Sequence, residues 1–249
     1  LALQNGDLYT VQRSELTRLR DTDADGRADE YLTHAKGWGV TGNYHEYAYG
    51  PTVDGAGNLW VALNCSIGKG SNPNNQWRGW SLRVKPDGSW APISGGFRSP
   101  SGIGTNLAGD VFATDQQGNW FPTCPLMHVK RGAFHGHADS LQFTSRPEAT
   151  FKVNLPLPKN LTVAEAAKLI PAYQLPAVWF PYRKMGMSTT DILADSTKGK
   201  FGPFAGQLFC GEFTMSFVSR VFLEKVGGEY QGACFRFREG LDCAALRLQ

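Results

Sequence analysis

Five residues between positions 21 and 29 offer oxygen ligands at the spacing of a calcium-binding loop. Such a loop begins with carboxylates at alternate positions, followed by a glycine that permits a sharp turn and by a main-chain carbonyl. Position 12, where an EF-hand needs a bidentate glutamate, is Leu32, so a helix-loop-helix is not expected. The sequence predicts bound calcium, or a similar hard cation, with a solvated acidic turn as the alternative. The expected ligands are Asp21, Asp23, Asp25, Arg27 through its carbonyl, and Asp29.

Two residues outside this run carry side chains suited to catalysis at neutral pH. His45 lies ahead of a predicted strand, and an imidazole can act as a general base because its ordinary pKa is near neutrality. Arg98 precedes a proline turn, where its fork of donors can hold a carboxylate or a quinone oxygen. A structural histidine and an ordinary salt bridge are the alternatives for these two residues.

The remaining histidine and cysteine patterns give weaker indications. His135 and His137 flank Gly136, which favours a turn over a strand, and no third ligand follows from the spacing, so structural roles are favoured. The five cysteines match neither a zinc ribbon nor a haem attachment site. Cys234 and Cys243 could close a short loop in an oxidising compartment, or all five could remain separate thiols.

Composition excludes several classes of protein. The 249 residues are 41% hydrophobic, enough for one large β domain with a sizeable core. The net charge is only +3 and the basic residues are scattered, so nucleic acid is not an expected partner. Since no apolar run approaches the roughly 18 residues that span a bilayer, no membrane span is expected either.

A repeated turn motif predicts the architecture. Four segments share a glycine, a polar residue, an aliphatic residue and then an aromatic one, and their glycines stand 51, 52 and 97 residues apart. A period near 50 with β character is typical of propeller blades, and the doubled interval suggests one unit with a weakened signature. The segments are Asn5-Gly6-Asp7-Leu8-Tyr9, Ala56-Gly57-Asn58-Leu59-Trp60, Ala108-Gly109-Asp110-Val111-Phe112 and Ala205-Gly206-Gln207-Leu208-Phe209.

One helix is expected, on a long connection between blades. Thr162 and Glu165 form a capping-box pattern ahead of a short apolar stretch that Pro171 ends. The predicted units are residues 1–50, 51–100, 101–150 and 187–249, with an inserted connection over 151–186. We therefore expect an all-β propeller, incomplete over residues 1–249, with about four to five blades.

With these residues in place, the chain resembles the glucose/sorbosone dehydrogenase superfamily of six-bladed propellers. The likeness is greatest to sorbosone-dehydrogenase-like propellers of large secreted bacterial proteins that also carry c-type haem modules. It covers nearly the whole chain and is carried by RLRDTDADGRADEY, RSPSGIGTNLAGDVFATDQQGNWFP, GAFHGHADSL and GPFAGQLFCGEFTMSFVSRVFLEKVGGEYQGACFRFREGL.

The resemblance implies a cofactor and residue roles. Characterised relatives hold pyrroloquinoline quinone (PQQ) beside calcium and oxidise a sugar or aldehyde. By resemblance, His45 matches the catalytic base, and Arg98 matches the arginine that contacts the reacting quinone carbonyl. Gly118 and Asn119 match the residues whose main-chain carbonyls hold a second calcium. It also implies a periplasmic or secreted location and electron transfer to a cytochrome c module, with its haem outside residues 1–249.

The sequence departs from the family pattern at three places. The aspartate that orients the base is replaced by Asn64 or Cys65, and the lysine that pairs with a quinone carboxylate is replaced near residues 213–215. Further quinone-binding arginines are expected at Arg236 or Arg238, or outside the chain.

These departures leave a second hypothesis open. It is a non-catalytic propeller, stabilised by calcium, that binds a glycan or a protein. Aromatic side chains expected at the surface could stack on sugars. They are Trp38, Trp77, Trp80, Trp90 and Trp120.

Overall fold

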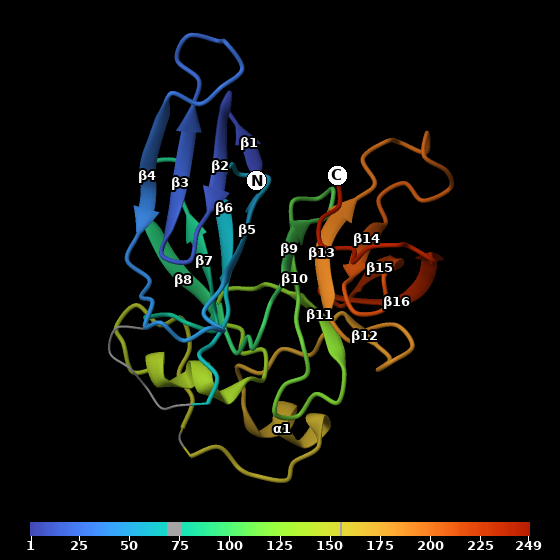
Figure 1. Cartoon of the computed structure of the whole chain (residues 1–249). Helices are drawn as coiled ribbons and strands as arrows, with labels where there is room; N and C mark the ends of the chain where they lie inside the picture. The colour runs from blue at the N-terminus through green and yellow to red at the C-terminus, as the bar shows by residue number, and fades with distance from the viewer. Residues whose placement is uncertain (69–75, 155) are drawn as a thin grey trace.

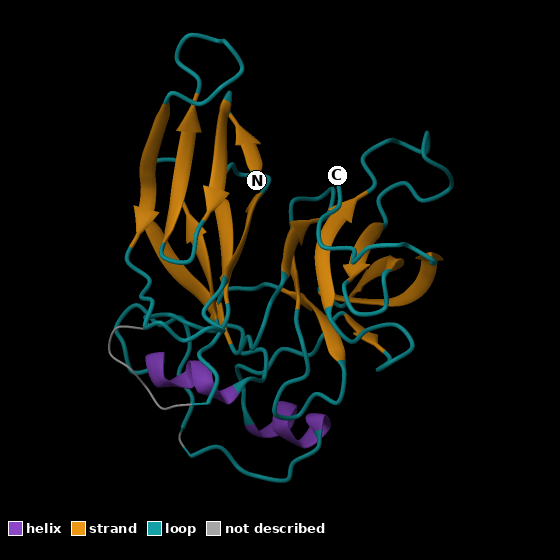
Figure 2. Cartoon of the chain, in the orientation of Figure 1, coloured by secondary structure: helices purple, strands orange, loops and turns teal. Residues whose placement is uncertain are grey.

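Four antiparallel four-stranded sheets make up the computed structural model, which describes residues 1–68, 76–154 and 156–249 (Figures 1 and 2). The first sheet holds β1 (Ala2–Gln4), β2 (Asp7–Val11), β3 (Glu15–Arg20) and β4 (Glu30–Lys36). The second holds β5 (Ala48–Val53), β6 (Leu59–Leu63), β7 (Trp80–Val84) and β8 (Trp90–Gly95). The third holds β9 (Gly102–Thr105), β10 (Val111–Thr114), β11 (Cys124–His128) and β12 (Val178–Phe180). The fourth holds β13 (Thr189–Ala194), β14 (Leu208–Glu212), β15 (Phe217–Val226) and β16 (Glu229–Arg238).

Each sheet is an up-and-down meander whose strands are hydrogen-bonded in chain order. This is the arrangement of a propeller blade, and four such sheets with open edges fit the predicted incomplete all-β propeller. Two helical segments lie below the sheets in Figure 1: the 3₁₀ helix η1 (Ala138–Phe143) and α1 (Val163–Leu169). No helix in the described part of the chain has both the length and the hydropathy to cross a bilayer.

The repeated glycines occupy equivalent places in the four sheets. Gly6, Gly57, Gly109 and Gly206 each lie in the turn just before the second strand of a sheet, at φ between 77° and 85°. Residues with a Cβ rarely adopt this left-handed conformation, which explains why glycine recurs there. The sequence repeat therefore marks one hairpin per blade.

The doubled interval in the repeat has a different cause from the one expected. Among the described residues between Gly109 and Gly206 there is no further sheet, because the two glycines belong to consecutive sheets. The third sheet instead carries a long excursion between β11 and β12, and this excursion includes η1 and α1. β12 falls within the 151–186 stretch and completes that sheet, so the described residues form four blades.

The helix expected near residue 162 forms as predicted. The Thr162 hydroxyl accepts a hydrogen bond from the Glu165 amide, and the Glu165 carboxylate accepts one from the Thr162 amide at 2.8 Å. These two bonds satisfy backbone donors that the first turn of a helix leaves free. Ile170 is the C-cap, and Pro171 follows it.

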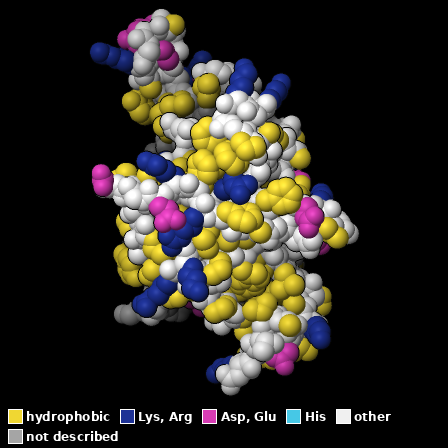
Figure 3. Space-filling view, turned by 90° about the vertical axis from the view of Figure 1, so that its right-hand side faces the viewer, with side chains coloured by type: hydrophobic (Ala, Val, Ile, Leu, Met, Phe, Trp, Pro, Cys, Tyr) yellow, Lys and Arg dark blue, Asp and Glu magenta, His cyan; other side chains and the backbone are white. Residues whose placement is uncertain are grey.

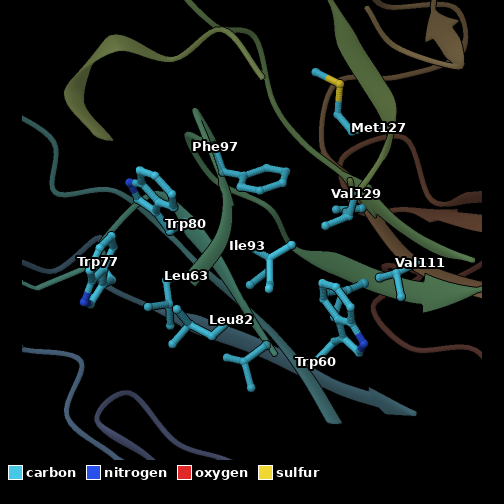
Figure 4. Packing of buried hydrophobic residues seen from close by; sticks show 14 of the residues in the cluster. Trp60, Leu63, Trp77, Trp80, Leu82, Ile93, Phe97, Val111, Met127 and Val129 are labelled. Carbon is cyan, nitrogen blue, oxygen red and sulfur yellow. The ribbon is translucent and has the colours of Figure 1, made fainter. Parts of the chain in front are cut away.

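A shared apolar core joins the blades. Every residue of β6 is buried, and Figure 4 shows Trp60 and Leu63 of this strand packed near Ile93 of β8 and Val111 of β10. A second cluster joins the third and fourth sheets, with Phe180 and Cys210 fully buried. Burial of both sheet faces explains why several strands are continuously apolar rather than alternating.

The fourth sheet leaves large apolar side chains in solvent. Figure 3 shows apolar side chains gathered on the side of the molecule that this sheet occupies. Relative exposures run from 37% to 55%. The residues concerned are Phe201, Phe222, Val226, Phe235 and Phe237.

His135 makes the stability of the fold sensitive to acid. The ring is fully buried against Phe97, at 4.6 Å between ring centroids, and burial lowers its pKa from 6.5 to about 3. Between these two values the unfolded chain binds a proton that the folded chain does not. The free energy of unfolding should therefore decrease as the pH is lowered from 6.5 to about 3. His135 should contribute up to about 1.4 kcal/mol of this decrease per pH unit.

Urea unfolding at a series of pH values tests this. We expect His135→Gln, which cannot titrate, to show a shallower loss of stability below pH 6.5 than the wild type. Equal pH slopes in the two proteins would show that His135 is not a source of the acid sensitivity.

Candidate functional site

The candidate site lies on the loops at one end of the blades, shown at the lower side of Figure 1. His45 precedes β5, Arg98 joins β8 to β9, and Gly118 and Asn119 join β10 to β11. The acidic loop joins β3 to β4 at the opposite end of the first sheet. The structure therefore separates the predicted cation loop from the other predicted site residues.

His45 is held at both ring nitrogens. Nδ1 lies 2.8 Å from the main-chain carbonyl of Cys65, and Nε2 lies 2.7 Å from the hydroxyl of Ser99. Because a carbonyl can only accept, Nδ1 carries the proton and donates it, which leaves the Nε2 lone pair to accept from Ser99. This is the tautomer that a general base acting through Nε2 requires.

The environment of His45 favours the neutral ring. Burial lowers its pKa, the nearby charges of Arg98 and His137 lower it further, and the hydrogen bond to Cys65 acts in the opposite direction. The orienting group is thus the main-chain carbonyl of Cys65, a neutral group, rather than the side chain of Asn64 or Cys65. A carbonyl fixes the tautomer but stabilises an imidazolium less than a carboxylate would.

Two arginines, the buried Arg78 and the half-buried Arg13, position the loop that carries His45. Arg78 donates to the carbonyls of Gly39, Glu46 and Tyr47 at 2.8 to 3.0 Å, and to that of Arg13 at 2.6 Å. Arg13 in turn donates to the Glu46 carbonyl at 3.0 Å. A loop without regular structure is thereby fixed through its own backbone oxygens, and the Gly39 carbonyl has Arg78 as its donor.

The carboxylate of Glu46 closes the same loop. It accepts hydrogen bonds from the amide and hydroxyl of Thr41, at 2.6 and 2.7 Å, and from the hydroxyl of Ser66 at 2.6 Å. Ser66 follows Cys65 directly, so Glu46 ties the loop before β5 to the loop after β6. This contact helps to hold the Cys65 carbonyl under the His45 ring.

Asp115 shapes the turn that carries Arg98 and Ser99. Its fully buried carboxylate accepts from the amides of Arg98, Ser99 and Gln116 at 2.7 to 2.8 Å. Burial raises the pKa of Asp115, and the three amide donors oppose this because they stabilise the carboxylate. Asp115 thus fixes the Ser99 hydroxyl that meets His45.

His135 and His137 face different surroundings and do not form a pair. Gly136 turns the chain between them at φ 100°, where a Cβ would lie 2.6 Å from the Phe121 ring. His135 faces the hydroxyl of Ser94 at 3.3 Å inside the core. The structural role expected for His135 agrees with this position, whereas His137 faces the loop end.

His137 meets two side chains that the sequence did not connect with it. One ligand atom from each of Cys65, His137 and Asp139 lies within 4.8 Å of the others. Asn119 borders this group, since its side-chain oxygen accepts from the Ala138 amide at 2.9 Å. The predicted residue Asn119 is therefore brought near His137, with its side chain already engaged.

A cavity adjoins this group. It has a volume of about 730 Å³, and its lining includes Asn119, Trp120, Ala138 and residues 156–161 of the long excursion. The long excursion between β11 and β12 thus lines a cavity at the loop end of the blades.

The residues that the resemblance assigns to quinone carboxylates are less well suited to that role than His45 and Arg98 are to theirs. Arg236 donates to the Lys184 carbonyl at 2.7 Å and to the Glu239 carboxylate at 2.8 Å, so its guanidinium is already engaged. The turn between β14 and β15, at 213–216, supplies no lysine. The described residues thus fit the reacting end of a quinone, at His45 and Arg98, better than its carboxylates.

The acidic loop has the shape of an oxygen cage in solvent. Carboxylate oxygens of Asp21, Asp23 and Asp29 lie within 4.8 Å of one another. The Gly26 amide donates to Asp21 and the Thr22 amide to Asp29, both at 2.8 Å. These bonds shape the turn and are equally compatible with the solvated alternative.

The surface role expected for the tryptophans is wrong for three of them. Trp38, Trp77 and Trp80 are 2%, 3% and 0% exposed, because they form part of the core. Trp90 and Trp120 are partly buried. Stacking of sugars on a surface row of tryptophans is therefore not available here.

All five cysteines are free thiols. Cys65, Cys124 and Cys210 are buried, and burial raises the pKa of Cys124 to about 11. Cys234 and Cys243 are not joined, so the short loop that a disulfide would have closed is absent from the described chain.

Sequence reasoning missed the groups that hold His45 and Arg98 in place. Ser99 and Asp115 both stand in the stretch that carried the family resemblance, and Asp115 directly follows a buried strand. A carboxylate at the end of an apolar strand was the available signal, since a buried charge needs several donors.

Several solved structures are similar to this chain. A glucose dehydrogenase has a TM-score of 0.60 at 17% identity, covering 89% of this chain and 63% of that one. The PQQ-bound aldose sugar dehydrogenase of Streptomyces coelicolor has a TM-score of 0.57 at 17% identity. The match covers 93% of this chain and 62% of that one. The holo PQQ domain of Coprinopsis cinerea pyranose dehydrogenase has a TM-score of 0.56 at 12% identity. The match covers 95% of this chain and 66% of that one.

These similarities confirm the fold expected from the resemblance, that of the glucose/sorbosone dehydrogenase-like propellers. The chain spans less than two thirds of the length of the glucose dehydrogenases. No curated protein sequence matches the chain. A family model described as a domain of unknown function (DUF7133) matches residues 1–238, and the chain therefore belongs to that family.

Proposed function

We propose that this chain is part of a quinoprotein-like dehydrogenase that oxidises a sugar or an aldehyde. The observation that carries the proposal is the tautomer of His45, whose Nε2 is fixed as a proton acceptor at the loop end of a propeller. The likeness to a PQQ-bound aldose sugar dehydrogenase and to a holo PQQ domain supports it.

The residues of this chain would take the following parts. PQQ, when bound, supplies a two-electron acceptor for the hydride of the substrate. His45 Nε2 accepts the proton of the substrate hydroxyl after Ser99 gives way. Arg98 offers a positive charge to a quinone oxygen, and Asp115 holds the backbone of that turn in place. Gly118 and Asn119 belong to the proposed second calcium site, through their carbonyls.

The remaining parts of the proposal rest on the sequence resemblance. They are electron transfer to a cytochrome c module outside residues 1–249 and a periplasmic or secreted location in a bacterium. The sugar or aldehyde is the proposed small-molecule partner.

A non-catalytic propeller that binds a glycan or a protein is the second candidate. The engaged guanidinium of Arg236 and the absence of a lysine at 213–216 favour it, because both weaken the site for quinone carboxylates. The burial of Trp38, Trp77 and Trp80 counts against the glycan version.

Reconstitution separates the two candidates. The protein at its full natural length is incubated with PQQ and Ca²⁺, freed of unbound quinone, and supplied with aldoses or aldehydes and a dye acceptor. We expect retained quinone absorbance and dye reduction that depends on both substrate and quinone. Absence of retained quinone would exclude the dehydrogenase.

The acidic loop should couple calcium to stability rather than to turnover. If calcium is held by the folded loop alone, saturating Ca²⁺ should raise the melting temperature by several degrees, since a ligand at about 100 times its Kd adds about 2.7 kcal/mol. The double variant Asp21→Asn, Asp23→Asn should lose this response. Asp87→Asn, in an exposed turn elsewhere, should keep it. A wild-type melting temperature indifferent to Ca²⁺ would leave the loop as a solvated turn.

A further inference from the structure

Three side chains that come together only in the folded chain have the chemistry of a transition-metal site. Cys65 follows β6, His137 lies in the turn after Gly136, and Asp139 is in the first turn of η1. Thiolate, imidazole and carboxylate are the three ligand types that zinc takes in proteins. The ligand atoms lie within 4.8 Å of one another.

The spacing is close to that of a bound ion. Ligand atoms at tetrahedral positions about 2.0–2.1 Å from a metal are about 3.4 Å apart. His137 Nε2 and Asp139 Oδ2 are 3.5 Å apart, which matches one edge of such a tetrahedron. That separation is too long for an ordinary hydrogen bond between the two groups. Cys65 Sγ lies within 4.8 Å of both atoms, so a small inward movement of the thiol would complete three corners.

His137 itself indicates that a partner belongs here. Both ring nitrogens are shielded from solvent and make no hydrogen bond among the described residues, and Nε2 faces the Asp139 carboxylate at 3.5 Å. A buried polar group without a partner is costly, and such groups are rare in folded proteins. A cation between His137, Cys65 and Asp139 would satisfy one of these nitrogens and remove the cost at that atom.

We propose that Cys65, His137 and Asp139 form a binding site for a borderline divalent ion of the zinc class. The donor set excludes calcium and magnesium as the preferred ions, because both favour oxygen ligands alone. Three protein ligands leave one position open, as in zinc sites that bind water or substrate. The site lies close to His45, whose Nδ1 bonds to the carbonyl of the same Cys65. It does not depend on PQQ.

Cobalt substitution tests the site, because a thiolate bound to Co²⁺ gives a strong charge-transfer absorption that oxygen and nitrogen ligands do not. The protein at its full natural length is reduced, stripped of metal and titrated with Co²⁺, without quinone. We expect the sulfur-to-cobalt band to saturate at about one equivalent and to be abolished by Zn²⁺.

Variants assign the band to its ligands. Cys65→Ser should abolish it, and His137→Ala and Asp139→Asn should each weaken Co²⁺ binding at least tenfold. Cys243→Ser, at an exposed cysteine, and the double variant Asp21→Asn, Asp23→Asn should leave the band unchanged. Near-ultraviolet circular dichroism of each metal-free variant checks that the fold is intact.

The outcomes separate this site from the dehydrogenase. Absence of the band in the folded wild type, or a band that survives Cys65→Ser, would overturn the metal site. Failure of PQQ to bind in a protein that gives the cobalt band would overturn the dehydrogenase and leave the metal site standing.

Discussion

Replacing His45 with alanine should lower turnover of the reconstituted protein about 10² to 10⁴-fold, the range expected for loss of a general base. Nε2 is the atom fixed as a proton acceptor, by Ser99 on one side and by the Cys65 carbonyl through Nδ1 on the other. Quinone retention should change little, because the ring would contact the substrate hydroxyl. The measurement is steady-state dye reduction with an aldose or aldehyde, together with quinone absorbance.

The pH dependence adds an independent check on His45. Since burial lowers its pKa from 6.5, the neutral form persists below that value. We expect kcat/KM of the wild type to remain high as pH falls through 6.5 and to decline only at lower pH. Ser99→Ala keeps the imidazole and should reduce turnover much less than His45→Ala. Turnover in His45→Ala above a tenth of wild type would exclude His45 as the base.

Replacing Arg78 with leucine should destabilise the fold by roughly 3–5 kcal/mol, the largest stability effect we expect. The side chain is 1% exposed and donates to four backbone carbonyls. Leucine fills part of the volume but removes a donor from all four oxygens. The Gly39 carbonyl then keeps no donor among the described residues, whereas the Arg13, Glu46 and Tyr47 carbonyls keep one each. Urea unfolding monitored by tryptophan fluorescence measures the loss.

The control for Arg78 lies on the neighbouring strand. Arg83→Leu, at a half-buried position of β7, should change the free energy of unfolding by less than about 1 kcal/mol. Arg78→Lys should be intermediate, because an ammonium has three donors and no planar fork. Equal urea midpoints for Arg78→Leu and Arg83→Leu would mean that the carbonyl contacts of Arg78 make no net contribution to the free energy of unfolding.

The blade hairpins could be predicted from the sequence because each hairpin depends on local backbone geometry. Gly57 and Gly109 take left-handed φ values that a side chain opposes, so the turn leaves a mark in the residue type. The helix at Thr162 was predictable for the same reason, since its cap is made within four residues.

The blade count was harder to predict, because spacing along the chain does not distinguish a missing hairpin from an inserted excursion. Between β11 and β12 the chain leaves the third sheet and returns to it. Only the pairing of Leu126 with Val178, far apart in sequence, reveals this. Long-range pairing of this kind leaves no local signature.

Some residues of the candidate site could also be predicted from the sequence, and others could not. His45 and Arg98 were found from residue chemistry and resemblance, whereas the grouping of Cys65 with His137 depends on how two loops fold over β6 and η1. The tryptophans failed as surface markers because residue type alone does not distinguish a core position from a surface one, in loops as well as in strands. Trp80 shows the first case, with its indole N–H bonded to the Ser140 carbonyl at 2.9 Å.

The apolar side chains in solvent on the fourth sheet have a consequence for colloidal behaviour. Phe222 and Phe235 are 49% and 44% exposed, and a net charge of +3 gives little mutual repulsion between molecules. Solutions of residues 1–249 should therefore show attraction between molecules, seen in light scattering as a negative second virial coefficient that added salt makes more negative. Under such conditions an unfolding midpoint varies with protein concentration, and a dilution series separates self-association from intrinsic stability.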